Sequence, residues 1–236
     1  MTQAARSLVV MQPTFLPWAG YFNLMAQADV FVFLDDVQLE KQSWQTRNRL
    51  LSNGNVQWVS ATIRHVQLSQ TIAETQTLID VRWSKKLMRG FSQNYSKHPY
   101  YDAALEIMNS LADHANGTLA GLNEAVIRHV AMRLGISTPM YRASDLNIAG
   151  VRSNRLIAFC EHFEANEYIS PVGSADYLDE DGFSEKASAK LRFQDYTPLP
   201  YFQKGTKEFI SHLSIVDVVA NLGWDATYKY VIGNTD

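Results

Sequence analysis

The chain has 236 residues, of which 46% are hydrophobic and 19% charged, and its formal net charge at pH 7 is −3. This balance is typical of a globular protein with a sizeable core. It provides no electrostatic footprint for nucleic acid or an anionic membrane. The sequence contains no apolar run of about 18 residues and no signal-peptide pattern, so we expect a cytoplasmic protein without a membrane span.

The N-terminal part of the chain reads as strand, loop, helix and strand. Residues 8–11 are a short apolar run, and the two prolines of the loop 12–17 exclude a central strand or a helix interior there. Apolar residues recur at helical spacing over 20–28. Residues 30–34 form a continuous apolar run, which is typical of a parallel strand buried on both faces. The pattern predicts a βαβ unit.

Two loops of this unit, 12–17 and 35–48, follow the carboxyl ends of strands. In open α/β sheets ligands bind at that edge, near the point where the strand order reverses. The two loops and their neighbours are unusually rich in groups that can form hydrogen bonds or stack. These groups are Gln12, Trp18, Tyr21, Asp35, Asp36, Gln38, Lys41, Trp44, Arg47 and Asn48. We therefore place the candidate site there.

The middle of the chain predicts a hairpin followed by helices. Asn53-Gly54 is a hairpin turn signal, and 56–63 alternates as a second arm that ends near Arg64-His65. A helix is expected from Trp83 to about Tyr95. Two further helices follow, capped by Asp102 and Thr118 and ending near Leu111 and Gly135. We assign this helical region, about 83–135, to the core and attach no chemistry to it.

Strand, loop and helix alternate again after residue 135. We expect strands at 138–141, 167–170 and 189–194, a helix over 154–164 capped by Ser153, and a last helix capped by Ser214, with Asp217 in a capping box, that ends at Gly223. Polar loops at Ser144 and at 171–178 follow the first two of these strands. The predicted fold class is α/β, with a mostly parallel, Rossmann-like sheet flanked by helices in one compact domain with a hairpin insertion.

Asp35 and Asp36 are the best candidates for chemistry. A strand-end Asp at a crevice can orient a hydroxyl, hold a divalent ion or accept a proton. Adjacent residues of a strand end point to opposite sides, so we expect one of the two to face the site and the other to cap the loop. Arg47 suits a phosphate or a carboxylate because its fork binds two oxygens. Its structural alternative is a salt bridge to Asp35 or Asp36.

Several other features limit the possible chemistry. Trp18, Tyr21 and Trp44 can stack on a sugar or a base, although aromatic residues near strand ends more often belong to the core. The single cysteine, Cys160, excludes an internal disulfide, and its apolar helical setting indicates a buried residue without thiol catalysis. The six histidines lack zinc-binding spacings, and glycine-rich phosphate-binding motifs are missing. His65 has a plain interpretation as a surface residue.

The N-terminal motifs resemble the WbqC-like family. The resemblance lies in MQPTFLPWAGYF at 11–22, ADVFVFLDDVQ at 28–38 and W-x-x-RN at 44–48, and it continues to about residue 224 through YSKHPYY at 95–101 and GSADYL at 173–178. It implies an association with bacterial surface polysaccharide (O-antigen) gene clusters. It also implies transfer of an aminoacyl group, such as glycyl, to an amino sugar.

The leading hypothesis is therefore an acyl transfer without a covalent enzyme intermediate. The amine of a nucleotide-linked amino sugar would attack a thioester on an acyl or aminoacyl carrier protein or on coenzyme A, which serves as co-substrate, and no covalently bound cofactor is expected. Such a reaction needs a base, donors for the oxyanion and a sugar pocket. We expect Asp35 or Asp36, alternatively His65, as base, Gln12 and Asn48 as donors or orienters, and Arg47 for a substrate phosphate. The other substrate-binding candidates are Pro13, Trp18, Tyr21, Gln38, Lys41, Trp44, Ser144, Ser170, Tyr177 and Gln203.

Two alternatives remain open. One is a non-catalytic module that binds a sugar nucleotide or a carrier protein. The other is a nucleotidylyltransferase-like enzyme, because the segment from Pro13 to Tyr21 has the layout of a strand-to-helix nucleotide motif without its histidines. The first predicts binding without turnover, and the second predicts metal-dependent binding of a nucleoside triphosphate.

Overall fold

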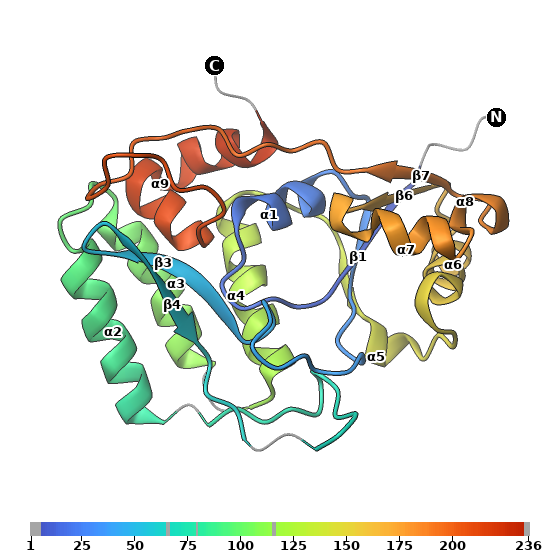
Figure 1. The fold of residues 1–236 in the computed structure, drawn as a ribbon, viewed down its shortest axis with the longest axis horizontal. Coiled ribbons are helices and arrows are strands. Elements are labelled where there is room, and N and C mark those ends of the chain that lie inside the picture. Colours follow the sequence, from blue (N-terminus) through green and yellow to red (C-terminus); the bar gives the residue numbers. More distant parts are fainter. Residues whose placement is uncertain (1–5, 65–66, 79, 115–116, 234–236) are drawn as a thin grey trace.

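A computed structural model describes residues 6–64, 67–78, 80–114 and 117–233 of the chain. In Figure 1 a parallel sheet with its helices lies on one side, and a hairpin with a group of longer helices lies on the other. The elements in chain order are β1 (Ser7–Met11), α1 (Ala19–Ala26), β2 (Val30–Phe33), β3 (Arg47–Ser52), β4 (Asn55–Ser60), α2 (Val81–Tyr95), α3 (Tyr101–Asp113), α4 (Leu119–Arg133), β5 (Met140–Arg142), α5 (Ala143–Leu146), α6 (Arg152–His162), β6 (Glu167–Ser170), η1 (Val172–Ser174), α7 (Ala175–Glu180), α8 (Phe183–Lys186), β7 (Lys190–Phe193) and α9 (Ile215–Ile232).

The main sheet has five strands in the order β5-β2-β1-β6-β7, and all neighbouring pairs are parallel. The chain moves outward from β1 through β2 to β5, then crosses to the other side of β1 and continues through β6 to β7. The strand order therefore reverses between β1 and β6, which creates a switch point of the Rossmann type. The predicted α/β fold class is confirmed. Its strands match the expected ones to within about two residues, a normal margin for element ends.

Each face of the sheet is covered by its own apolar core. Val9, Phe31 and Phe33 point into the larger core, which they share with buried residues of α1, α3, α4 and α9. Leu8 and Val30 point to the opposite face, where residues of α6, α7 and α8 cover them. Because both faces are covered, β2 is apolar at every position, as the continuous run 30–34 indicates.

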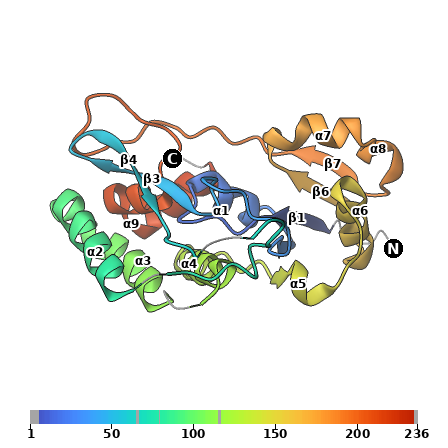
Figure 2. The same cartoon turned by 60° about the horizontal axis from the view of Figure 1, so that its bottom comes forward.

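The hairpin β3–β4 forms a separate antiparallel sheet that lies over α2 and α3 in Figure 2. Asn53 and Gly54 both have positive φ, 50° and 76°, so the predicted turn is confirmed. The second arm ends at Ser60, three residues earlier than expected. Helix α2 starts two residues before Trp83, because the side chain of Asp80 accepts a hydrogen bond from the Trp83 backbone N–H at 2.8 Å.

The predicted helix caps are partly confirmed. Thr118 caps α4 by accepting a hydrogen bond from the Gly121 N–H at 3.1 Å. Asp102 lies inside the first turn of α3, whose N-cap is Tyr100, and Ser153 lies inside α6, whose N-cap is Val151. Both predictions were wrong because each helix begins two residues earlier than expected. Residues 172–180 also differ from the expected polar loop, since they form η1 and α7.

The last helix continues beyond its predicted end. The Ser214 hydroxyl caps it by accepting a hydrogen bond from Val216 N–H at 3.3 Å. Gly223 produces a kink at φ 74° and the helix then resumes as far as Ile232. A Cβ at this glycine would lie 2.7 Å from the Tyr100 ring, so glycine permits this close approach. Asp217 forms no capping box. Its buried carboxylate accepts hydrogen bonds from the Tyr95 and Tyr201 hydroxyls at 2.8 and 2.7 Å.

Candidate functional site

The carboxyl edge of the sheet brings Asp35 and Ser144 together, both of which are predicted site residues. Asp35 follows β2 and is buried, and its two carboxylate oxygens accept hydrogen bonds from Ser144 N–H at 3.0 Å and Ser144 Oγ at 2.6 Å. Ser144 lies in α5, directly after β5. The carboxylate of Asp35 therefore fixes the start of α5 against the end of β2.

Asp36 points away from Asp35 toward α6. It forms a bidentate ion pair with Arg155, with Nη1 to Oδ1 at 2.9 Å and a second bond from Nη2 to Oδ2. The two adjacent carboxylates thus have different partners, as the alternation of a strand end predicts. The salt bridge proposed for Arg47 is not formed. Its guanidinium lies over the Trp58 ring, 4.4 Å from the centroid.

The loop 12–17 is held by the amides of Gln12 and Asn48. The Gln12 side-chain oxygen accepts a hydrogen bond from Gln45 Nε2 at 2.8 Å, and Asn48 Nδ2 donates to the Phe15 carbonyl at 3.0 Å. The Tyr21 hydroxyl donates to the Gln12 carbonyl at 3.2 Å. The amide nitrogen of Asn48 is therefore already donating within the protein, Gln12 is engaged through its oxygens, and both residues fix the loop after β1.

Two residues of α4, Asn123 and Glu124, complete this cluster, and the sequence-based assignment of α4 to the core overlooked them. Asn123 Nδ2 donates to the carbonyls of Pro13 and Gln45, both at 2.9 Å, so it joins the two loops. A consecutive buried Asn-Glu pair interrupts the apolar pattern of α4. Such an interruption is the signal that could have revealed them, because buried polar groups need a partner or a role.

Glu124 is a buried carboxylate with one engaged oxygen. Its Oε2 accepts a hydrogen bond from Arg142 Nε at 2.7 Å, while its buried Oε1 has no hydrogen-bond partner within the described part of the chain. Burial raises the pKa of Glu124. The bond to Arg142 opposes this shift, and the nearby charge of Asp35 adds to it. The side chain combines a proton-accepting oxygen with an environment that disfavours its charged form.

A hollow of about 240 Å³ lies at the end of β5; Glu124 does not line it, but the two arginines that contact Glu124 do. It is lined by Arg128, Met140, Tyr141, Arg142, Asp145 and Leu146. Arg128 and Arg142 are the two cations near Glu124, at 3.8 and 2.7 Å, and both side chains are partly exposed. The hollow therefore presents two guanidinium groups next to a buried carboxylate.

The remaining predicted residues are dispersed. Gln38 and Lys41 are exposed, Trp44 is half exposed against Trp58, and His65 lies outside the described residues. Trp18 packs against His212 with ring centroids 4.5 Å apart, and buried Gln203 donates to the Ile210 carbonyl at 2.9 Å. Ser170 ends β6 and Tyr177 lies on α7. These residues do not join the cluster around Asp35 and Glu124.

The described residues include few candidates for a catalytic nucleophile or for a metal ligand. Burial raises the pKa of the Cys160 thiol to about 12, so it stays protonated at neutral pH. Across the ranges that the structure describes, no three His, Cys, Asp or Glu side chains are grouped so that they could hold a metal ion. The same residues include no helix that is both long and apolar enough to cross a membrane.

A five-stranded parallel sheet with a central switch point and polar side chains at its carboxyl edge defines a Rossmann-type α/β protein. Residues 12–229 match the model of the WbqC-like protein family, and the chain belongs to that family. It is 30% identical over 227 residues to the "Uncharacterized protein Rv1507c" of Mycobacterium tuberculosis, a match that covers 94% of this chain and 96% of that protein. No solved structure matches the chain.

Proposed function

We propose that this protein transfers an acyl group, an aminoacyl group such as glycyl being the expected one, from a thioester to the amine of a nucleotide-linked amino sugar for bacterial surface polysaccharide. Membership of the WbqC-like family supports the setting. The observation that carries the chemistry is the buried carboxylate of Glu124 at the carboxyl edge: its Oε2 lies beside Arg128 and Arg142, and its Oε1 has no hydrogen-bond partner among the described residues. This carboxylate is our candidate base.

The proposed reaction needs one proton acceptor. The amine nitrogen attacks the thioester carbonyl carbon, a C–N bond forms, and the C–S bond breaks as the tetrahedral intermediate collapses. The proton leaves the amine nitrogen for Glu124 and then passes to the departing thiolate, which leaves as a thiol. A carboxylate whose pKa is raised by burial accepts that proton more readily than an exposed one.

Arg128 and Arg142 supply the expected contacts for the sugar nucleotide. Guanidinium groups bind phosphate oxygens in pairs, and these two line one hollow at the end of β5. A phosphate there would draw Arg142 away from Glu124 and strengthen the carboxylate as a base, because the arginine hydrogen bond lowers its pKa. Asp35 positions the adjacent Ser144.

Direct attack of the substrate amine on the thioester, without an acyl-enzyme intermediate, is consistent with the environment of the single cysteine. Cys160 has a pKa of about 12 and lies in the apolar core between α6 and the sheet, so it is a poor acceptor for an acyl group. Asp35 and Asp36 stay candidates for the base. However, their oxygens are already engaged with Ser144 and Arg155, which favours positioning roles.

The test is a product assay. Wild-type protein is mixed with uridine and thymidine diphosphate amino sugars and with acetyl or glycyl thioesters of coenzyme A or a carrier protein, and the mixture is analysed by mass spectrometry for an N-acylated sugar nucleotide. Glu124→Gln should lower kcat by about 10²–10⁴ and still bind the sugar nucleotide. Glu106→Gln is the matched control, because Glu106 forms a surface salt bridge with Arg133.

Three results would contradict the proposal. Turnover by Glu124→Gln at the wild-type rate would show that Glu124 is not the base. Release of pyrophosphate from a nucleoside triphosphate with magnesium, without any amide product, would instead support nucleotidyl transfer. Binding of sugar nucleotides without turnover of any thioester would favour the non-catalytic module.

A further inference from the structure

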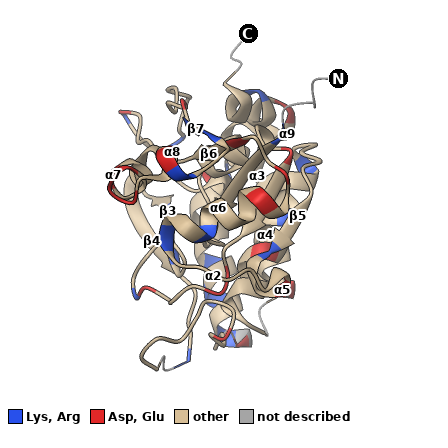
Figure 3. Cartoon of the chain, turned by 90° about the vertical axis from the view of Figure 1, so that its right-hand side faces the viewer, with Lys and Arg blue, Asp and Glu red and all other residues tan. Residues whose placement is uncertain are grey.

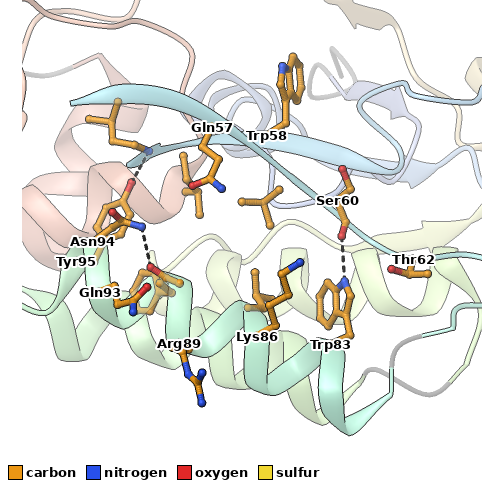
Figure 4. A pocket seen from close by; sticks show the side chains of 16 residues that line it. Gln57, Trp58, Ser60, Thr62, Trp83, Lys86, Arg89, Gln93, Asn94 and Tyr95 are labelled. Atoms are coloured by element: carbon orange, nitrogen blue, oxygen red, sulfur yellow. Dashed lines mark hydrogen bonds between the residues drawn. The ribbon is translucent and has the colours of Figure 1, made fainter. Parts of the chain in front are cut away.

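A hollow lies away from the sheet, between the hairpin β3–β4 and helix α2 (Figure 4). It has a volume of about 520 Å³. Its apolar lining comes from Leu50, Leu51, Val59, Leu87 and Phe91, and Trp83 and Tyr95 lie toward opposite ends of the α2 side. We call this hollow the hairpin groove. Its shape suits an extended chain.

The polar side chains of the hairpin groove are amides, hydroxyls and cations. Gln57 and Gln93 provide amides, and Lys86 and Arg89 provide positive charge, whereas the Asn94 amide is already bonded to Gly90 and Ser52. Among the described residues no acidic side chain lines the groove. In Figure 4 Gln57 and Lys86 point into the space between hairpin and helix, while Arg89 points away from the hairpin. The expected ligand therefore carries amide groups and a negative charge.

Helix α2 extends this positive charge beyond the groove. It contains Arg82, Lys85, Lys86 and Arg89 and no acidic residue, although the whole chain has a net charge of −3. All four side chains are exposed, and none forms a salt bridge within the parts of the chain that the structure describes. Elsewhere the two signs are interspersed, as on the side shown in Figure 3. A helix surface of one sign attracts a partner of the opposite sign.

One end of the groove is connected through the hairpin to the loop 12–17. Trp83 Nε1 donates to the Ser60 carbonyl at 3.2 Å, and Ser60 pairs with Arg47 in the hairpin register. The next residue, Asn48, holds the loop 12–17 through Phe15. The Trp83 end is therefore close along the hairpin to the loop that follows β1, and a chain lying in the groove would be directed toward that loop.

We propose that the hairpin groove binds the phosphopantetheine arm of an acidic acyl-carrier protein, with the acidic surface of the carrier docked on the α2 cations. The inference rests on the proposed function and names its donor. The arm is an extended chain with two amides, a phosphate at one end and the thioester at the other, which matches an elongated groove with amide side chains and a cation. Arg82 and Lys85 do not line the groove, and Arg89 points outward. Cations spread in this way fit an extended acidic surface rather than the phosphates of free coenzyme A.

The test measures binding of a fluorescently labelled bacterial acyl-carrier protein by anisotropy, with no acceptor present. We expect the holo form to bind at least tenfold more tightly than the apo form. Gly90→Leu should remove that advantage, because Gly90 lines the groove and an added Cβ meets no atom within 4 Å, so the helix can accept the change. Gly90→Ala is the matched small substitution and should bind like the wild type.

A second pair of variants separates docking from insertion of the arm. Arg82→Glu with Lys86→Glu should weaken both carrier forms at least tenfold and reduce the salt dependence, whereas Lys190→Glu, an exposed change on β7, should bind as the wild type does. Equal binding of carrier by wild type and the Arg82/Lys86 double variant would overturn the inference. Binding of coenzyme A that is sensitive to Gly90→Leu, without carrier binding, would also overturn it.

The two proposals can fail separately. Carrier binding that depends on Gly90 and the α2 cations, without amide formation in the product assay, would leave the groove assignment standing and remove the transferase. Amide formation from coenzyme A thioesters that is unaffected by Gly90→Leu would remove the groove assignment and leave the transferase.

Discussion

The carboxyl edge of the sheet and the hairpin groove differ in how their polar groups are used. At the edge, Asp35, Asp36, Gln12 and Asn48 have protein partners. In the groove, Lys86 faces open space and no carboxylate is paired with it. The many polar residues of the sequence motifs therefore hold the loops of the edge in place through hydrogen bonds. A charged side chain that is unpaired and faces a hollow is instead available to bind a ligand. Glu124 lies at the edge but resembles the groove in one respect, because one of its carboxylate oxygens has no hydrogen-bond partner within the described part of the chain.

The largest expected effect distinguishes the three carboxylates at the edge. Glu124→Gln should reduce kcat by about 10²–10⁴, whereas Asp35→Asn and Asp36→Asn should reduce it less, because each acts through a neighbouring group. Wild-type kcat should also fall as the pH is lowered through the pKa of Glu124, which burial raises above its ordinary value of 4.5. Initial rates of amide formation from pH 4 to pH 8 measure both. Loss of turnover in Asp35→Asn alone would make Asp35 the base.

The second contrast between the edge and the groove is the effect of a substitution on the free energy of unfolding. Arg155→Leu breaks the bidentate pair with Asp36 and leaves a partly buried carboxylate, so it should lower the free energy of unfolding by about 1.5–3 kcal/mol. Lys86→Ala, in the groove, should change it by less than about 0.5 kcal/mol. Urea denaturation of both variants tests this. Equal costs would contradict the division into a paired edge and an unpaired groove.

The fold could largely be predicted from sequence, because its signals are local. The apolar run 30–34, the Asn53-Gly54 turn and the Thr118 cap each depend on a few neighbouring residues. The end of α9 was mispredicted, because the kink at Gly223 depends on Tyr100 from a distant segment.

The site was predicted less completely. Asp35 and Ser144, which the sequence named in two separate loops, lie together at the carboxyl edge, whereas Asn123 and Glu124 were not named from the sequence. These two lie in an apolar helix, and their partners come from loops and strands far away in the sequence. The hairpin groove was also missed, since a hollow arises from how a hairpin and a helix pack and leaves no pattern in either.

A smaller effect should appear in the pH dependence of stability. Burial and the charge of Lys204 hold the pKa of His98 below its ordinary value of 6.5, and His98 packs against Tyr95 at one end of the groove. A depressed histidine pKa contributes stability above pH 6.5 that is lost as the pH falls through the folded-state pKa. The stability difference between wild type and His98→Gln should therefore shrink from pH 7.5 to pH 5. A difference that grows would contradict this assignment.

The smallest effect concerns Cys160. With a pKa of about 12 the thiol should resist iodoacetamide at pH 8 in the native protein and react only after unfolding. Cys160→Ala should leave the rate of amide formation unchanged within experimental error. Rapid native alkylation accompanied by loss of turnover would reopen a covalent mechanism.

The most direct test of both proposals is the steady-state kinetics of amide formation. The concentrations of the carrier protein, loaded with an acetyl thioester, and of the amino-sugar nucleotide are varied independently. We expect Gly90→Leu to raise KM for the carrier at least tenfold and to leave KM for the sugar nucleotide unchanged. We expect Glu124→Gln to lower kcat with little effect on KM for the carrier. A change in both KM values in Gly90→Leu, or an unchanged kcat in Glu124→Gln, would contradict the assignment of donor to the groove and acceptor to the carboxyl edge.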